Sequence, residues 1–147
     1  EIKRNQTKLP EDAFSGDFKA VKKWIDTDFH IESTDTKGFT ALSEASCAGH
    51  TDIVRYLLEL GADPNSMNSE MKSPLWRAAY FNHIDVVLVL LNAGGDPALR
   101  TKQNQAAIDV AKSDELMEVF KNWDMGTTLD LKREREKIME EQVLFTA

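Results

Sequence analysis

Apolar residues recur along this chain at helical spacing, in short segments separated by turns that contain glycine, proline, aspartate and asparagine. The clearest unit predicts one helix from Thr40 to Ala48, which Gly49 ends because glycine adopts the left-handed conformation at no steric cost. A second helix is expected from Asp52 to Leu60, where the apolar residues fall at the i, i+1, i+4 and i+5 spacing of one buried stripe. One such pair cannot bury both of its faces, so neighbouring pairs must stack on it.

The same pattern returns 33 residues later along the chain. A fixed period in the range of roughly 20 to 50 residues is typical of stacked repeats. The equivalent positions are Leu42 and Leu75, His50 and His83, Leu57 and Leu90, Gly61 and Gly94, and Asp63 and Asp96.

The segment from Asp35 to Asn65 resembles the ankyrin repeat, whose signature is D-x-x-G-x-T-P-L-H-x-A-A. The residues that carry this resemblance include Asp35, Gly38, Thr40, Ala41, Leu42, Ala45, Gly49, His50, Gly61, Ala62 and Asp63. The resemblance implies an all-α ankyrin-repeat solenoid of about four stacked helix-turn-helix units, with a charged helix at the C-terminus.

The period also sets the expected boundaries. We expect an ankyrin repeat domain over residues 1–124, with repeats at about 5–34, 35–67, 68–100 and 101–124, and a charged helical extension over 125–147 that leads to a region missing from this sequence. The first repeat is degenerate, with helices predicted at Glu11–Ser15 and Phe18–Ile25 and with Asp17 as the N-cap of the second. A degenerate terminal repeat is expected to cap the stack.

Two turn positions depart from the repeat pattern. Met71 stands where the family usually has the turn glycine, which puts a regular β-turn in doubt there. In repeat 4, Asn104 can supply the left-handed conformation that glycine would supply. Repeat 4 is also shorter between Ala111 and Leu116, which indicates a trimmed loop between its helices, and Trp123 is expected to cover the end of the stack.

The extension after residue 124 is dense in alternating basic and acidic residues, which is typical of a solvated helix. Thr127 or Thr128 is expected to cap it. Leu131, Ile138 and Phe145 recur every seven residues. Few apolar residues occupy the d positions of the same heptads, so the sequence does not decide whether this helix forms a coiled coil.

Composition restricts the kind of partner. The chain has 147 residues and a net charge of −7, from 25 acidic and 18 basic side chains, which argues against a nucleic-acid groove. Cys47 is the single cysteine, so a reducing compartment is the simpler interpretation. No apolar run is long enough to cross a bilayer. The first residue is not Met and no apolar leader follows it, so we expect a fragment of a longer chain.

Ankyrin repeats bind partners through their turn tips and the exposed side of their first helices, so the resemblance points to those positions. The predicted partner-binding residues are Thr36, Lys37, Phe39, Cys47, Ser69, Glu70, Lys72, Trp76, Arg77, Tyr80, Phe81, Lys102, Gln103 and Gln105. Trp76, Arg77, Tyr80 and Phe81 stand out because aromatic and guanidinium groups are enriched in binding hot spots. The alternative is that Trp76 and Phe81 only pack against the next repeat. We expect Arg77→Ala and Tyr80→Ala to weaken binding at a nearly unchanged melting temperature.

Catalytic and metal chemistry find little support in the sequence. Cys47 and His50 have an i, i+3 spacing, but a closed zinc site needs about four ligands and no second cysteine exists. We therefore expect His50 and His83 to fix the loop between helices by hydrogen bonds. No phosphate-binding loop or nucleophile with a base is present, so we expect no enzyme, no cofactor, no metal and no small-molecule substrate.

Asn65 resembles the asparagine that ankyrin repeats offer to asparaginyl hydroxylases, which implies a possible hydroxylation site. The alternative is a turn residue only. Repeat 3 has Ala98 at the equivalent place, so only one repeat could be modified.

The end of repeat 4, from Ser113 through Trp123 and Asp124 into the charged helix, resembles the IQ motif and ankyrin repeat domain-containing proteins. That resemblance implies a cytoplasmic scaffold in a cytoskeletal or ciliary setting. No IQ motif is present here, so calmodulin binding is not implied. The function expected is non-catalytic protein binding, and the alternatives are a structural spacer that positions flanking domains or a regulatory module of a larger enzyme.

Overall fold

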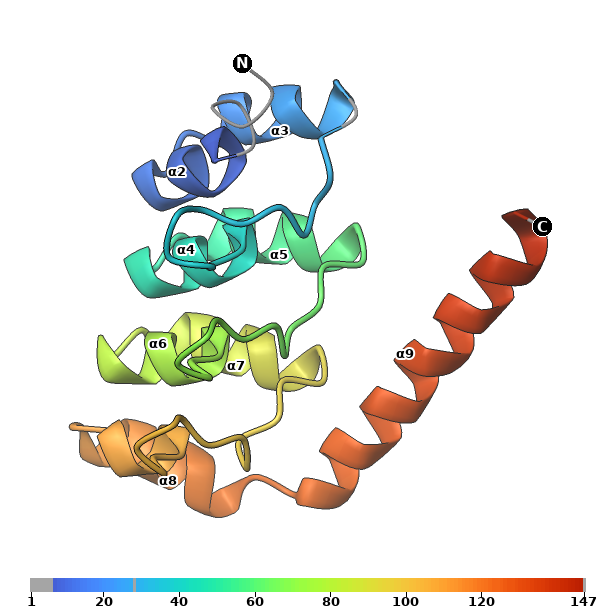
Figure 1. Ribbon diagram of the computed structural model, residues 1–147. Coiled ribbons are helices and arrows are strands. Elements are labelled where there is room, and N and C mark those ends of the chain that lie inside the picture. Colours follow the sequence, from blue (N-terminus) through green and yellow to red (C-terminus); the bar gives the residue numbers. More distant parts are fainter. Residues whose placement is uncertain (1–6, 28, 147) are drawn as a thin grey trace.

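The computed structural model describes residues 7–27 and 29–146, which form a row of stacked helix pairs followed by one long helix (Figure 1). The expected start of repeat 1 near residue 5 and the end of the extension at 147 lie outside the described residues. Repeats 1 to 4 contain, in order, α2 (Lys8–Ser15) and α3 (Phe18–Asp26), α4 (Ala41–Ala48) and α5 (Thr51–Glu59), α6 (Pro74–Tyr80) and α7 (Ile84–Asn92), and η1 (Ala107–Val110) and α8 (Asp114–Asn122). The long helix is α9 (Met125–Thr146).

In Figure 1 the first helices α2, α4 and α6 form one column, and the second helices α3, α5 and α7 form the next. Within residues 7–27 and 29–146 the sole β pairing is an isolated bridge between Thr34 and Thr40. The all-α solenoid predicted from the 33-residue period is therefore confirmed. The same part of the chain contains no helix long and apolar enough to cross a membrane.

Local sequence fixes where each helix begins and ends. The hydroxyls of Thr40 and Ser73 accept hydrogen bonds from the backbone N–H groups three residues later, at 3.2 and 3.1 Å, and so cap α4 and α6. Asp17 caps α3 in the same way at 3.0 Å, as predicted. Gly49 ends α4 in the left-handed region with a φ of 81°.

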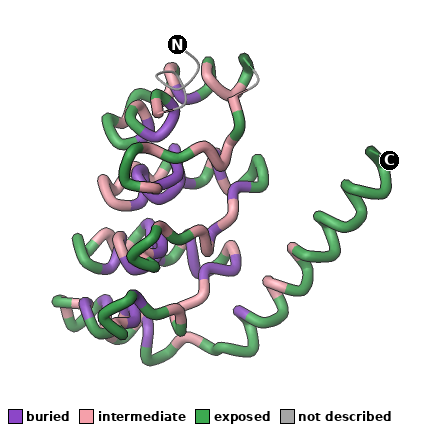
Figure 2. The backbone as a smooth tube through the Cα atoms, in the orientation of Figure 1, coloured by how far each residue is buried: buried purple, intermediate pink, exposed green. Residues whose placement is uncertain are grey.

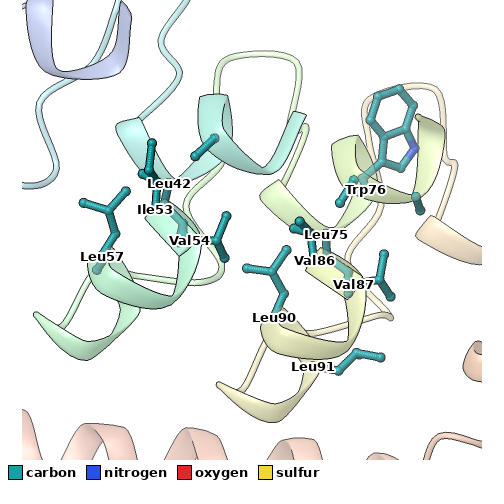
Figure 3. Packing of buried hydrophobic residues seen from close by; sticks show 14 of the residues in the cluster. Leu42, Ile53, Val54, Leu57, Leu75, Trp76, Val86, Val87, Leu90 and Leu91 are labelled. Carbon is teal, nitrogen blue, oxygen red and sulfur yellow. The ribbon is translucent and has the colours of Figure 1, made fainter. Parts of the chain in front are cut away.

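The core is continuous from repeat to repeat. Leu42 and Leu75 on the first helices and Leu57 and Leu90 on the second helices are at most 1% exposed, and they belong to one apolar cluster (Figure 3). Figure 2 shows buried residues concentrated where the helix pairs meet, whereas most of α9 is exposed. Each repeat therefore buries its apolar face against its neighbours, as the solenoid requires.

Histidines join consecutive repeats. His50 Nε2 lies 2.9 Å from the carbonyl oxygen of Phe14, and His83 Nε2 lies 2.9 Å from that of Cys47. A carbonyl oxygen only accepts, so each Nε2 donates. The His50 ring fills the space that a side chain on Gly16 would need, and the His83 ring fills the space that a side chain on Gly49 would need. A Cβ on Gly49 would lie 2.6 Å from His83 Nδ1. The predicted hydrogen-bonding role is confirmed, but the bond reaches the preceding repeat.

The turns of repeats 3 and 4 both form without glycine. Met71 has a φ of 58° and its N–H donates to Asn68 O at 2.9 Å, so the doubt about this turn was wrong. Asn104 has a φ of 62°, and its N–H donates to Thr101 O at 2.8 Å, which confirms its left-handed role. At both positions the side chain in the left-handed conformation is exposed to solvent.

Repeat 4 is shortened in a different place from the one predicted. Three residues, 111–113, join η1 to α8, and three residues, 81–83, join α6 to α7, so the loop is not trimmed. The shortening instead removes part of the first helix, leaving the four residues of η1. A four-residue segment of this kind completes only one tight turn.

The last helix begins earlier than predicted. It starts at Met125, where Asp124 Oδ1 accepts from the N–H of Gly126 at 2.9 Å, so neither Thr127 nor Thr128 caps it. Thr128 is fully buried instead and accepts from Trp123 Nε1 at 2.8 Å. Trp123 packs against the core cluster at the end of the stack, as expected.

Candidate functional site

The turns that precede the first helices form one edge of the stack, and each is organised by one side-chain oxygen. Asp35 Oδ1 accepts from the backbone N–H groups two and four residues later, at 2.9 and 3.0 Å. Asn68 Oδ1, one repeat on, accepts from the corresponding groups at 3.1 Å. Thr101 Oγ1 accepts from the N–H of Gln105 at 3.3 Å. Three tips of related shape therefore follow one another along the edge.

Neighbouring tips are also bonded to one another. Asn68 Nδ2 donates to the carbonyl oxygen of Lys37 at 3.4 Å, and the N–H of Lys102 donates to that of Glu70 at 3.0 Å. Because these bonds join repeat 2 to repeat 3 and repeat 3 to repeat 4, the three tips form a preformed rim.

A groove of about 980 Å³ lies between this rim and the first helices. All of the predicted partner-binding residues line it except Lys102. The lining residues are Thr36, Lys37, Gly38, Phe39, Cys47, Asn68, Ser69, Glu70, Lys72, Trp76, Arg77, Tyr80, Phe81, Gln103 and Gln105. Positions that are far apart in sequence and share a place in the repeat thus meet in one concave surface.

Aromatic side chains of α6 and of the following linker form the apolar part of the groove. Trp76 stacks on Tyr80 with ring centroids 5.3 Å apart, and Tyr80 meets Phe81 edge to face at 5.0 Å. Tyr80 and Phe81 are 41% and 53% exposed, whereas Trp76 is 8% exposed. Phe39, predicted as a partner-binding residue on a turn tip, is also buried. Tyr80 and Phe81 therefore offer the free aromatic surface, and Trp76 supports it.

Arg77 has a structural role between repeats. Its Nη1 donates to Glu44 Oε1 at 2.5 Å and to Ser43 Oγ at 3.1 Å, and its guanidinium carbon lies 3.6 Å from the centre of the Phe39 ring. The side chains of Arg77 and Glu44 are only 12% and 11% exposed. Removing Arg77 would leave a nearly buried carboxylate without its partner, so an unchanged melting temperature is no longer expected for Arg77→Ala.

Lysines surround the aromatic residues. Lys72 Nζ lies 2.8 Å from Glu70 Oε2 and 5.3 Å from the centre of the Trp76 ring. Lys112, in the linker before α8, holds its ammonium group 4.6 Å from the centre of the Tyr80 ring. Cation–π contacts of this kind place positive charge beside the apolar surface of the groove.

The groove offers little to catalysis. Burial raises the pKa of the Cys47 thiol, and the nearby Arg77 only partly opposes this, so the reactive thiolate is disfavoured. Among residues 7–27 and 29–146 no group of three or more His, Cys, Asp and Glu side chains gathers as a metal site. His50 and His83 use Nε2 for the bonds between repeats described above.

Asn65 joins repeat 2 to repeat 3. Its Nδ2 donates to the carbonyl oxygen of Gly94 at 3.0 Å, and its Oδ1 accepts from the N–H of Asp96 at 2.8 Å. The side chain thus has a structural role as well as its place in the turn. Hydroxylation of Asn65 stays a prediction.

The sequence did not point to every residue of the site. Gly38 and Asn68 line the groove, and Lys112 flanks it, although none of the three was predicted. Asn68 lies 33 residues after Asp35, so the period could have identified it as a turn former. Nothing in the sequence indicated Lys112, because its position depends on the shortened first helix of repeat 4.

Comparison with known proteins places this geometry in a family. A family model described as ankyrin repeats (3 copies) matches residues 11–101. The human protein phosphatase 1 regulatory subunit 27 is 36% identical over 66 residues, which are 45% of this chain and 43% of that protein. The human ankyrin repeat and SOCS box protein 3 is 35% identical over 71 residues, covering 46% of this chain and 14% of that protein.

A third relative, the human apoptosis-stimulating of p53 protein 2, is 34% identical over 61 residues, which are 42% of this chain and 5% of that protein. The chain aligns with less than half the length of each of these relatives. The resemblance to IQ motif and ankyrin repeat domain-containing proteins stays a prediction. The family match covers more than half of the residues and coincides with the stacked helix pairs, and the chain therefore belongs to the ankyrin repeat family.

Proposed function

We propose that this chain is a non-catalytic protein-binding module whose partner occupies the groove between the turn tips and the first helices of repeats 2 to 4. Ankyrin repeats are protein-interaction modules, and stacked repeats present extended concave surfaces for binding. The observation that carries the proposal is the exposed pair Tyr80 and Phe81 inside a preformed groove. Aromatic anchors in a concave, rigid site bind with little loss of conformational entropy.

Two further features favour this face as the binding surface. The rim is fixed by hydrogen bonds between successive tips, so a partner meets a surface that is already ordered. The apolar floor is flanked by charged and amide side chains, which matches the polar rim and apolar centre of protein interfaces.

A photo-crosslinking experiment tests the proposal. A photoreactive amino acid would replace Gln103 in the groove of the full chain, and the matched control would replace Asn92, which is exposed on α7. We expect a crosslinked protein from Gln103 that is absent from Asn92, and we expect Tyr80→Ala in the same chain to reduce its yield. Equal crosslinking at both positions, or none at Gln103, would contradict the proposal.

A spacer function is the second candidate, because α9 is anchored to the stack and not only attached to its end. Lys132 forms an ion pair with Asp96, and Arg135 donates to the carbonyl oxygens of Gly61 and Ala62 at 2.7 and 2.9 Å. A helix held in this way could orient a flanking domain. A pull-down with residues 1–124 separates the two candidates, since a pure spacer would retain no partner.

A third candidate is a regulatory module of a larger enzyme, for which the name of the protein phosphatase 1 regulatory subunit 27 is the support. A cytoplasmic location, and a cytoskeletal or ciliary setting within it, also stay predictions. Assay of a full-length enzyme with and without the repeats would test the regulatory candidate.

A further inference from the structure

We propose that the occupant of the groove is a linear, acidic protein segment that carries a large apolar side chain. This inference rests on the proposed function and adds the chemistry of the partner. It draws on two features of the groove: lysines at this face that no carboxylate pairs, and exposed aromatic rings.

The charge around the groove is opposite to that of the whole chain, which has a net charge of −7. The acidic side chains nearby are already engaged. Glu70 pairs with Lys72 at 2.8 Å, Glu44 pairs with Arg77 at 2.5 Å, and the carboxylate of Asp35 accepts backbone N–H groups within its own turn. Hydrogen bonding and attraction from Lys72, with a smaller attraction from Lys102, lower the pKa of Glu70.

Three lysines at this face are left without a carboxylate partner among residues 7–27 and 29–146: Lys37, Lys102 and Lys112. Lys37 belongs to the tip of repeat 2, Lys102 to the tip of repeat 4, and Lys112 to the linker beside Tyr80. Lys37 therefore lies in the lining of the groove, and the other two charges lie beside it, at the tip of repeat 4 and next to Tyr80. Such spacing suits several carboxylates along an extended segment better than one compact anion.

The apolar part of the groove adds a second requirement. Tyr80 and Phe81 lie side by side, with 41% and 53% of their surface exposed, and they face the same groove. An aromatic or long aliphatic side chain of the occupant would cover them and remove apolar surface from water. A segment with acidic residues alone would leave this surface exposed.

A nucleic acid fits the same lysines less well. Three uncompensated lysines would neutralise few phosphates, and the negative charge of the whole molecule would repel a long polyanion. The groove therefore matches an acidic polypeptide, and a single-stranded oligonucleotide serves as the competing probe.

The test begins with a displayed library of short, random, linear peptides selected on the full chain. The enriched peptides would then be synthesised and titrated against the wild type and two variants. The groove variant carries Lys37→Gln, Lys102→Gln and Lys112→Gln. The control variant carries Lys19→Gln, Lys121→Gln and Lys137→Gln, which are exposed lysines on α3, α8 and α9, away from the tips and from Tyr80, so both variants lose the same charge.

We expect enriched peptides that combine acidic residues with at least one large apolar residue. We expect the groove variant to bind them about tenfold more weakly at low ionic strength, with a smaller dependence on salt, while the control variant changes little. Tyr80→Ala should weaken the same peptides by about tenfold or more at all salt concentrations.

Each contrary result has a distinct meaning. Enriched peptides without an acidic excess, or equal loss in both lysine variants, would overturn this inference and leave the proposed protein binding intact. Enrichment of no peptide, or tight binding of the oligonucleotide alone, would overturn the linear acidic segment as occupant. Absence of a crosslink at Gln103 would separately overturn the proposed function.

Discussion

Contacts between neighbouring repeats differ in kind from the contacts that hold α9 to the stack. Between repeats, fully buried residues such as Leu57 and Leu90 share one core, and His83 fills the space beside Gly49. Against the stack, α9 uses the charged groups of Lys132 and Arg135, and Thr128 at its start is the single buried residue over Met125–Thr146. The first kind excludes water over a large area and the second does not.

This difference shows where the stability of the molecule lies. A residue in the shared core loses apolar burial and leaves a cavity when it is shortened. A charged group near the surface exchanges its contact for water, at small net cost. We therefore expect substitutions to unfold the stack in the first case and to release α9 alone in the second.

The largest expected difference compares two leucines. Leu90→Ala should lower the free energy of unfolding by about 2–5 kcal/mol, because Leu90 is completely buried. Leu144→Ala should change it by less than about 0.5 kcal/mol, because Leu144 is 77% exposed on α9. Urea denaturation followed by circular dichroism measures both. Similar losses would mean that α9 shares the core of the repeats.

A second pair of variants compares a buried ion pair with an exposed one. Arg77→Ala should destabilise the stack by about 3 kcal/mol, because Glu44 would stay nearly buried without its partner. Arg100→Ala breaks the exposed pair with Asp109 and should cost less than about 1 kcal/mol. Thermal unfolding of both variants gives the comparison. A melting temperature of Arg77→Ala equal to that of the wild type would restore the expectation drawn from the sequence.

A third comparison isolates the histidine contact. Gly49 and Gly61 both have positive φ angles, of 81° and 91°, but a Cβ added to Gly49 would meet the His83 ring, whereas one added to Gly61 would meet nothing within 4 Å. Both alanine variants should carry the strain of a left-handed residue, roughly 1–2 kcal/mol. Gly49→Ala should cost about 1–3 kcal/mol more, because its methyl group would displace His83. Equal unfolding free energies would show that the ring moves freely.

The smallest expected effect concerns the anchoring of α9. Replacing both Lys132 and Arg135 by alanine should change the stability of the stack by about 1 kcal/mol, less than Arg77→Ala, because removal of Lys132, whose side chain is 33% exposed, lets water reach the Asp96 carboxylate. Amide hydrogen exchange in α9 should become faster, because the helix loses its bonds to Asp96 and to two backbone carbonyls. Lys137→Ala is the control, since Lys137 is exposed. Unchanged exchange in the double variant would mean that apolar contacts hold α9.

The sequence predicted the parts of the molecule that follow the period and missed those that break it. The helix pairs, the cap at Asp17 and the left-handed Asn104 depend on local residue chemistry, which the repeat displays directly. The shortened first helix of repeat 4 was misplaced into the loop, because a deletion of residues does not show which element absorbs it. The start of α9 was predicted too late because Thr127 and Thr128 are of a residue type that caps helices, whereas Asp124 is the residue whose side chain accepts from the first turn.

The groove shows the same division. Positions along the tips were predicted because they share a place in the repeat, and nearly all of them line one surface. The burial of Phe39 and Trp76, and the ion pair between Arg77 and Glu44, depend on which side chains meet across two repeats. That pairing is a tertiary property, so one repeat read alone does not display it.

The position that ends the first helix of each repeat restricts the order in which the repeats can follow one another. Repeats 1 and 2 each end their first helix with a glycine that leaves room for the histidine of the next unit, whereas repeat 3 has Asn82 there, with a φ of 58°. The unit that follows supplies Ser113, whose hydroxyl donates to Asn82 Oδ1 at 2.8 Å. A tandem duplication of repeat 2 would preserve a matching junction, whereas a duplication of repeat 3 would press an imidazole against an asparagine. The array could therefore lengthen by duplication of repeat 2 without disturbing a junction, whereas duplication of repeat 3 would create a steric clash.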